Sequence, residues 1–340
     1  MKTLLFISGL LVSAFASAQE NCGFPVSLLK SGFEAGEQPS VVTLPPANTP
    51  LMLAVESPTQ GSIVGTEFVQ VFGNYTGPTN TGITVNSIAA ATTATRYASA
   101  PIRLTVGVNT ITIVATTTDG VTQTASRTVT YDPNQSPDVE LAVDAFSGFA
   151  PARVPFAVRY RLPALQTTLT RVEIDYQGDG IYEFDGPSLP LSLSFNFDNV
   201  GDYAPTVRLT FDDGNSVTPL VVRNASARVV LESLARTRQT ICFVYYEMKH
   251  RLQPGASGIP SALNTLVPPL RAEYQQIWTD LAGNLGTAAN QVGEIVDGQI
   301  ADTMAEFTVA VPDPAVPGEF FGFPVHFRRS SDGVWRISEM

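Results

Sequence analysis

The chain has 340 residues, of which 31 are acidic and 20 are basic, so its formal net charge at pH 7 is −11. Because the basic residues are scattered and form no polybasic segment, this balance argues against nucleic acid and anionic membrane surfaces as partners. The length exceeds that of one ordinary domain, so we expect several domains along the chain.

Residues 1–18 have the layout of a cleavable secretory signal. Lys2 precedes the apolar run Leu4–Val12, and Ala16-Ser17-Ala18 stands ahead of Gln19. We therefore predict a mature chain that begins near Gln19 and is secreted, periplasmic or exposed at the cell surface. Downstream of the signal, no stretch approaches the roughly 18 consecutive apolar residues that a membrane-spanning helix requires.

Two cysteines, Cys22 and Cys242, remain after removal of the signal. An oxidising compartment allows them to pair, which would tie the mature N-terminus to the C-terminal domain. Alternatively, Cys242 is a small buried hydrophobe within the run Ile241–Val244. No cysteine pair has metal-ligand spacing, and only two histidines are present, so we expect no zinc site.

Breaks in composition divide the mature chain into four parts. Residues 19–50 form an N-terminal tail and linker, rich in proline toward its end. The first domain covers residues 51–132, and the turn-rich segment DPNQSPD separates it from the second domain, residues 138–231. Near Leu231 the apolar period changes from two to about 3.6, which places a different kind of domain at residues 232–340.

The first domain is predicted to be a β-sandwich. Short β-favouring runs such as Phe68–Phe72 and Ile83–Ile88 alternate with turns, and Gly107–Tyr131 reads as a hairpin about Asp119-Gly120. The segments ESPTQGSIVGTEFVQVFGNYTG, ITVNSIAA and GVNTITIVATTTDG resemble a bacterial immunoglobulin-like domain of secreted and surface proteins. This resemblance, over about 80 residues, implies a fold that binds or spaces rather than a chemical activity.

The second domain shows cleaner alternation. Apolar residues fall at every second position in four predicted strands, among them Val154 to Leu162, Leu189 to Phe197 and Tyr203 to Phe211. The order VEIDYQGDGIYEFDG, then FDNVGDYAPTVRLTFDDGNS, resembles a PKD-like domain, another small immunoglobulin-like sandwich of exported bacterial proteins. The resemblance again implies interaction or spacing.

The last domain is predicted to be α+β. Two helical stripes come first, one from Leu234 to Leu252 and one from Tyr274 to Leu285, and three alternating strands follow. The segments AEFTVAV and FPVHFRRSSDGVWRI resemble a small NTF2-like domain, in which helices cover a curved sheet. The predicted fold is therefore mainly β, with two tandem immunoglobulin-like sandwiches followed by an NTF2-like α+β domain.

One acidic loop has half of the pattern of a calcium site. Oxygen-bearing residues alternate before the turn glycine Gly180, but the twelfth position is Gly186 instead of a bidentate glutamate. The residues that would supply oxygen ligands are Asp175, Gln177, Asp179, Glu183 and Asp185. The alternative is a hairpin whose aspartates and glycines serve only the backbone geometry.

Three aromatic residues of the first domain, Phe68, Phe72 and Tyr75, are candidate ligand-binding residues. Phe68 and Phe72 alternate with Val69 and Val71, so one of the two apolar pairs must leave the sandwich core. An exposed aromatic patch there would stack on sugar rings or on a neighbouring domain, and we favour the domain contact.

We predict no catalytic residues. The catalytic motifs of hydrolases, metalloproteases and nucleotide-binding enzymes are missing from the sequence. His326 shares a strand face with Arg328, opposite Phe323, Val325 and Phe327, so it should point away from the helix-covered side.

These observations lead to a hypothesis and two alternatives. The chain is predicted to be an exported, non-catalytic interaction or adhesion protein whose immunoglobulin-like modules bind protein or carbohydrate at the cell envelope, without a cofactor. In the first alternative the C-terminal domain is an NTF2-like hydrolase or isomerase, and the sandwiches target it. In the second, the chain is a structural subunit of a surface assembly.

Overall fold

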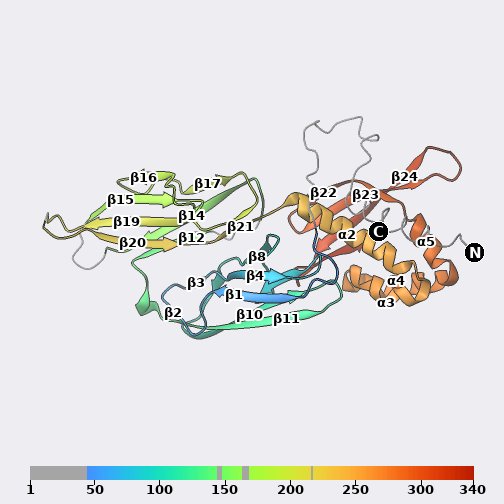
Figure 1. Cartoon of the computed structure of the whole chain (residues 1–340), viewed down its shortest axis with the longest axis horizontal. Helices are drawn as coiled ribbons and strands as arrows, with labels where there is room; N and C mark the ends of the chain where they lie inside the picture. Colours follow the sequence, from blue (N-terminus) through green and yellow to red (C-terminus); the bar gives the residue numbers. More distant parts are fainter. Residues whose placement is uncertain (1–43, 144–147, 163–167, 216) are drawn as a thin grey trace, which may run out of the picture.

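The computed structural model describes residues 44–143, 148–162, 168–215 and 217–340. Within them the protein is mainly β, with several small antiparallel sheets followed by a C-terminal region of helices and one sheet (Figure 1). Each part has its own cluster of buried apolar side chains. We call these parts the first module (residues 51–131), the second module (139–232) and the C-terminal module (233–340). The predicted signal, most of the tail and Cys22 lie outside the described residues.

The strands of the first module form two sheets and one separate pair of short strands. Its strands are β1 (Met52–Ser57), β2 (Ile63–Val64), β3 (Phe68–Val69), β4 (Phe72–Thr76), β5 (Gly82–Val85), β6 (Ile88–Ala89), β7 (Ala91–Thr92), β8 (Arg96–Ala98), β9 (Ile102–Arg103), β10 (Gly107–Thr116) and β11 (Thr122–Tyr131). One sheet has the order β1-β4-β8-β7 and the other β2-β11-β10-β5-β6, while β3 pairs with β9.

The predicted hairpin of the first module is confirmed. β10 and β11 pair antiparallel from Gly107 opposite Tyr131 to Thr116 opposite Thr122. Gly120 has a φ of +80° at the turn, a conformation that glycine adopts without steric cost. The run Phe68–Phe72 is not one strand, however, because β3 ends at Val69 and β4 begins at Phe72.

The second module follows the short 3-10 helix η1 (Pro133–Gln135). Its strands are β12 (Val139–Val143), β13 (Gly148–Phe149), β14 (Ala152–Tyr160), β15 (Thr168–Asp175), β16 (Phe184–Gly186), β17 (Ser194–Phe197), β18 (Gly201–Tyr203), β19 (Thr206–Asp212), β20 (Val221–Ser226) and β21 (Val229–Glu232). They form sheets of order β12-β14-β17, β13-β21-β18 and β16-β15-β19-β20 around a core rich in aromatic rings.

In two strands of this module, the alternation of apolar residues predicts a longer buried face than the structure shows. Val154 and Phe156 are buried as expected, but Tyr160 and Leu162 are 42% and 46% exposed, because β14 ends there. The run from Leu189 to Phe197 forms a strand only from Ser194 onward. The apolar period of two continues past the ends of both strands, so it does not mark where the covering sheet stops.

The C-terminal module packs helices on one face of an antiparallel sheet (Figure 1). Its helices are α2 (Leu234–Leu252), α3 (Ile259–Ala262), α4 (Arg271–Leu281) and α5 (Leu285–Gln291), with 3-10 turns η2 (Gly255–Gly258), η3 (Leu263–Thr265), η4 (Pro268–Leu270) and η5 (Ala282–Asn284). Its strands are β22 (Glu294–Ala301), β23 (Met304–Pro312), β24 (Phe320–Arg329) and β25 (Trp335–Glu339), in that order in the sheet.

Local signals at both ends explain the position of α2. The Ser233 side chain accepts a hydrogen bond from the Arg236 amide at the N-terminus, and basic residues occupy the last turn, where they favour the negative end of the helix dipole. Tyr245 and Met248 are buried against the sheet as predicted, whereas Leu234 is 39% exposed. No helix in the described residues is both long and apolar enough to span a membrane.

Two apolar stripes of this module are less buried than predicted. In α4, Trp278 is buried but Ile277 is 43% exposed, because the helices cover only part of the apolar face of α4. In β24, Val325 and Phe327 are buried while Phe323 is 52% exposed, since it lies toward the free end of the β23–β24 hairpin.

Candidate functional site

The structure does not bring Phe68, Phe72 and Tyr75 together as one exposed patch. Phe68 is 43% exposed on β3, whereas Tyr75 is only 8% exposed and its hydroxyl donates to the carbonyl of Thr93 at 2.9 Å. Phe72 lies beneath the guanidinium of Arg228, 4.7 Å from the ring centre, and belongs to a small apolar cluster between the first and second modules. For Phe72 the structure agrees with the domain contact that we favoured.

The acidic loop of the second module closes on its own backbone. Asp175 is buried, and its carboxylate accepts hydrogen bonds from the amides of Gly178, Asp179 and Gly180. Glu183 accepts from the Tyr176 amide and the Gln177 side chain. These bonds are what a purely structural loop needs.

Some features of the same loop suit a cation. Asp175, Asp179 and Glu183 offer carboxylate oxygens that all lie within 4.8 Å of one another. Asp185 is directed elsewhere, because Arg171 holds it through two hydrogen bonds of 2.9 and 2.7 Å. Calcium binding at this loop therefore stays a hypothesis, with three of the five predicted ligands gathered.

We expect Asp175→Ala to lower the free energy of unfolding by about 1–2 kcal/mol, because three backbone amides lose their charged acceptor. Urea denaturation of the mature protein, followed by far-ultraviolet circular dichroism, would measure the change. Asp179→Ala, at an exposed position of the same loop, is the control and should cost less. If millimolar calcium raises the midpoint of the parent protein but of neither variant, the loop is a cation site; equal stability of both variants would contradict the structural role of Asp175.

The remaining predicted residues do not join a site. Cys242 is buried in the core of the C-terminal module, but Cys22 lies outside the described residues, so their disulfide stays a prediction. His326 is half-buried, with its ring nitrogens 3.3 Å from Glu306 and 3.4 Å from Glu339. It lies on the face opposite Val325 and Phe327, the orientation expected from its position in the strand.

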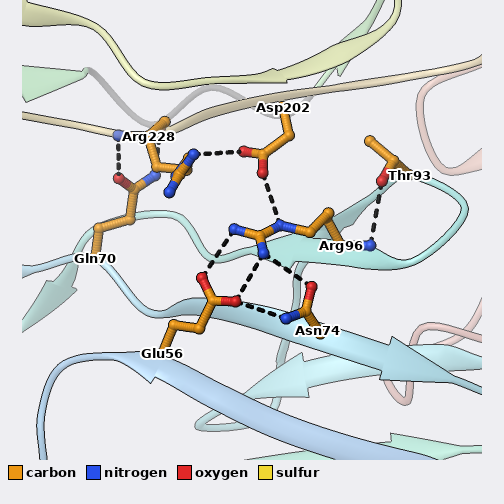
Figure 2. Close-up of polar contacts among 7 residues, drawn as sticks. All are labelled: Glu56, Gln70, Asn74, Thr93, Arg96, Asp202 and Arg228. Atoms are coloured by element: carbon orange, nitrogen blue, oxygen red, sulfur yellow. Dashed lines mark hydrogen bonds and ion pairs between the residues drawn. The ribbon is translucent and has the colours of Figure 1, made fainter. Parts of the chain in front are cut away.

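The most extensive polar arrangement lies between the first and second modules (Figure 2). Arg96 on β8 binds both oxygens of Glu56 on β1, at 2.7 and 2.9 Å, and donates from Nε to Asp202 on β18 at 2.7 Å. Asn74 contacts both Arg96 and Glu56. Since the side chain of Asp202 is only 17% exposed, Arg96 supplies the main positive charge that balances it.

Two hydrogen bonds between a side chain and the backbone also connect the first and second modules. The Gln70 side-chain amide donates to the carbonyl of Arg228 at 2.8 Å and accepts from its amide at 3.0 Å (Figure 2). The guanidinium of Arg228 also lies 3.4 Å from Asp202. We call the set Glu56, Gln70, Asn74, Arg96, Asp202 and Arg228 the Arg96 junction.

A second junction joins all three modules at Arg329. This side chain contacts Glu232 of the second module at 3.3 Å, and it donates to the carbonyl of Ala90 in the first module at 2.8 Å. Glu232 also accepts from Thr92, from its amide at 2.7 Å and from its hydroxyl at 3.3 Å. Arg329 and Glu232 have side chains that are each 11% exposed, so this ion pair is largely removed from water.

Two further contacts connect the first module to the C-terminal module. Asn80 is buried, and its side chain donates to the carbonyl of Trp335 and accepts from the Trp335 amide, both at 2.9 Å. Arg251 of α2 binds both carboxylate oxygens of Asp119 at the tip of the β10–β11 hairpin. The turn that the sequence predicted as a hairpin signal thus also supplies a charge to an interface.

Two of these carboxyl groups have lowered pKa values. The hydrogen bond from Arg96 holds the pKa of Glu56 below its ordinary value. Burial alone would raise the pKa of Asp119, but the hydrogen bonds and charge of Arg251 outweigh it and hold that pKa below its ordinary value. At these two contacts the neighbouring arginine therefore favours the ionised form of the carboxyl group.

This direction of shift predicts a loss of stability in acid. A carboxyl with a lower pKa in the folded state stabilises the fold above the unfolded-state pKa, and that contribution disappears as the pH falls through the folded-state value. We expect the melting temperature to fall as the pH is lowered below about 4. Asp119→Asn should melt lower at neutral pH and lose less on acidification; an acid loss as large as that of the parent would exclude Asp119 as a contributor.

A small polar cavity and a larger groove accompany the junctions. The cavity, about 60 Å³, lies beside Arg329 between the first and C-terminal modules, and Glu232 and Arg236 line it. The groove, about 420 Å³, lies between the first and second modules, and Phe68, Tyr131 and Tyr160 line it. Sequence reasoning identified Phe68 but missed Tyr160, whose position in the alternating run assigned it to the core.

Comparison with known proteins identifies no family. No protein-family model and no curated protein matches the chain. Among solved structures, it is similar to fibronectin(III)-like modules of Clostridium thermocellum CbhA, with 12% identity, a TM-score of 0.19, and coverage of 54% of this chain and 95% of that one. It is also similar to domains 5-6 of the S-layer protein SbsC, with 14% identity, a TM-score of 0.23, and coverage of 52% and 98%.

A third match is the tetra-tandem repeat in the extending region of a large adhesion protein, with 17% identity, a TM-score of 0.19, and coverage of 53% of this chain and 50% of that one. At such low TM-scores we draw neither fold nor function from these likenesses. The contacts of the chain itself define a mainly β protein whose modules are joined by charged interfaces.

Proposed function

We propose that the protein is an exported, non-catalytic binding protein that acts at the cell envelope or outside the cell, with two immunoglobulin-like modules and an NTF2-like C-terminal module. The observation that carries this proposal is a pair of ion pairs of low exposure that join one module to another. Arg96, Asp202, Glu232 and Arg329 all form bonds between modules, so they fix how the modules are presented. A fixed arrangement of modules suits a protein that acts by binding partners through its surface.

The core of the C-terminal module supports the same proposal over the enzyme alternative. Phe307, Phe327 and Trp278 fill the space between helices and sheet, where an NTF2-like enzyme would need polar groups around a cavity. His326 lies on the opposite face, beside two glutamates. An NTF2-like hydrolase or isomerase would therefore have to use residues away from this filled interior.

The structural-subunit alternative has one specific observation in its favour. Phe320, Phe321 and Phe323 are each at least half exposed in the β23–β24 hairpin, which extends away from the body of the module (Figure 1). A group of exposed aromatic rings of this kind is typical of an interaction surface. Solution mass and co-purification would distinguish an assembly subunit from a free binding protein.

The test is saturable binding of the mature protein, residues 19–340, to fractionated cell envelope and to secreted polysaccharide. The proposal predicts retention that excess untagged protein competes away, with bound protein identified by mass spectrometry and bound glycan by sugar analysis. The untagged protein serves as the specificity control. Absence of competable binding in every fraction would refute the binding function.

A further inference from the structure

The groove between the first and second modules has a defined shape and composition. Its first wall comes from the segment around β3 and its second wall from the ends of β12 and β14. The lining residues that matter for binding are Glu67, Phe68, Glu140, Arg159, Tyr160 and Arg161. A volume of about 420 Å³ at a module interface falls within the range usual for small-ligand sites, about 300–1,000 Å³.

The linker beside the groove is fixed to the first module. The Ser136 hydroxyl donates to the carbonyl of Gly65 at 3.1 Å, and the Asp132 amide donates to the carbonyl of Val64 at 3.0 Å. A side chain at position 65 would collide with the carbonyl of Gln135, so glycine allows the linker to lie directly against the first module. With the Arg96 junction as a second connection, the groove exists before a ligand arrives, and binding need not bear the cost of ordering it.

Each wall contributes a half-exposed aromatic ring. Phe68 of the first module is 43% exposed and Tyr160 of the second is 42% exposed. The Tyr160 ring is held against the buried ring of Phe211, with centroids 5.8 Å apart. Aromatic rings that face a solvent-filled groove offer apolar faces on which the C–H side of a sugar ring can pack, while the tyrosine hydroxyl remains available for hydrogen bonding.

The charges of the groove balance. Its two arginines and two glutamates sum to zero, and each is already paired with a nearby opposite charge. Arg159 lies 3.5 Å from Glu140, Arg161 is 2.9 Å from Asp138, and Glu67 is 2.7 Å from Arg103. A strongly anionic or cationic ligand would meet like charges here, whereas a hydroxyl both donates and accepts hydrogen bonds and can use both kinds of group.

We propose that this groove binds a neutral oligosaccharide, whose sugar rings pack on Phe68 and Tyr160 and whose hydroxyls bond to the arginines and glutamates around them. The inference rests on the proposed binding function and names its ligand class. A peptide segment is the competing occupant, but the paired charges favour a hydroxyl-rich ligand.

The experiment is calorimetric titration of the mature protein with cellohexaose, maltohexaose, xylohexaose and chitohexaose. At least one of the four oligosaccharides should bind. Phe68→Ala and Tyr160→Ala should each weaken its affinity about tenfold, corresponding to about 1.4 kcal/mol. Phe68→Trp should retain binding because it keeps an aromatic face. Tyr182→Ala is the matched control, since Tyr182 is 40% exposed, about as much as Tyr160, and does not line the groove. Melting curves verify that each variant is folded.

The other outcomes separate the groove from the general function. If an oligosaccharide binds with equal affinity to the Phe68→Ala and parent proteins, the groove proposal is overturned but the binding function stands. If none of the four sugars binds while Phe68→Ala abolishes capture of an envelope protein, the groove is a protein site and the glycan proposal is likewise overturned. Failure of every sugar together with absence of competable envelope binding would overturn both proposals.

Discussion

Replacing Arg329 by alanine is expected to lower the free energy of unfolding by about 3–5 kcal/mol, the largest effect of any single change considered. Arg329 contacts Glu232, the carbonyl of Ala90 and the carbonyl of Gly333, and thus one group in each module. Its removal leaves the Glu232 carboxylate at low exposure, with Thr92 as the remaining donor among the residues that the structure describes. A buried charge without a counter-charge is among the costliest defects that a point substitution can produce.

Denaturant unfolding of the mature protein would measure this loss, with Arg328→Ala as its control. Arg328 is the neighbouring arginine on the exposed face of β24, so its removal should change stability by about 0.5 kcal/mol or less. The double variant Arg329→Ala with Glu232→Gln should recover part of the loss, because the stranded charge is then gone. Equal losses for Arg328→Ala and Arg329→Ala would show that the three-module junction contributes no stability.

Local patterns predicted the elements of the fold well where the chain itself dictates the structure. The Asp119-Gly120 hairpin and the sequence of helices before strands at the C-terminus both depend on short-range signals: turn chemistry and apolar period. The same period failed at Leu191, which it placed in a core and which is fully exposed. The apolar period of a strand shows which residues share a face. How much of that face is buried depends on the sheet or helices that pack against it.

The junctions were not predictable for a related reason. Arg96 and Asp202 lie 106 positions apart, and Arg329 and Glu232 lie 97 apart, so no local spacing relates the partners. Each looks in the sequence like an ordinary surface charge on a strand. Only the packing of one module on another removes these side chains from water and makes their pairing specific. By contrast, Asp175 stood out because its partners lie three to five residues ahead in the same loop.

The second large effect is expected at Arg96. Arg96→Ala should cost about 2 kcal/mol, less than the Arg329 change, because Glu56 is 38% exposed and water can replace part of its interaction. Its main consequence is mechanical: Asp202 keeps only the longer contact with Arg228, and the first and second modules lose their central ion pair. We expect the variant to scatter X-rays with a larger radius of gyration and to be cleaved sooner by protease in the segment between the modules.

Arg103→Ala is the matched control for this prediction. Arg103 forms an ion pair with Glu67 of the same 2.7 Å length as that between Arg96 and Asp202, but within one module and with the arginine 75% exposed. Its removal should leave scattering and cleavage unchanged. A double-mutant cycle between Arg96→Ala and Asp202→Ala then isolates the bond across the interface from general loss of charge. Additive effects of the two changes would mean that the Arg96–Asp202 bond does not couple the first and second modules, and that other contacts, such as those of Gln70, Phe72 and Arg228, hold them together.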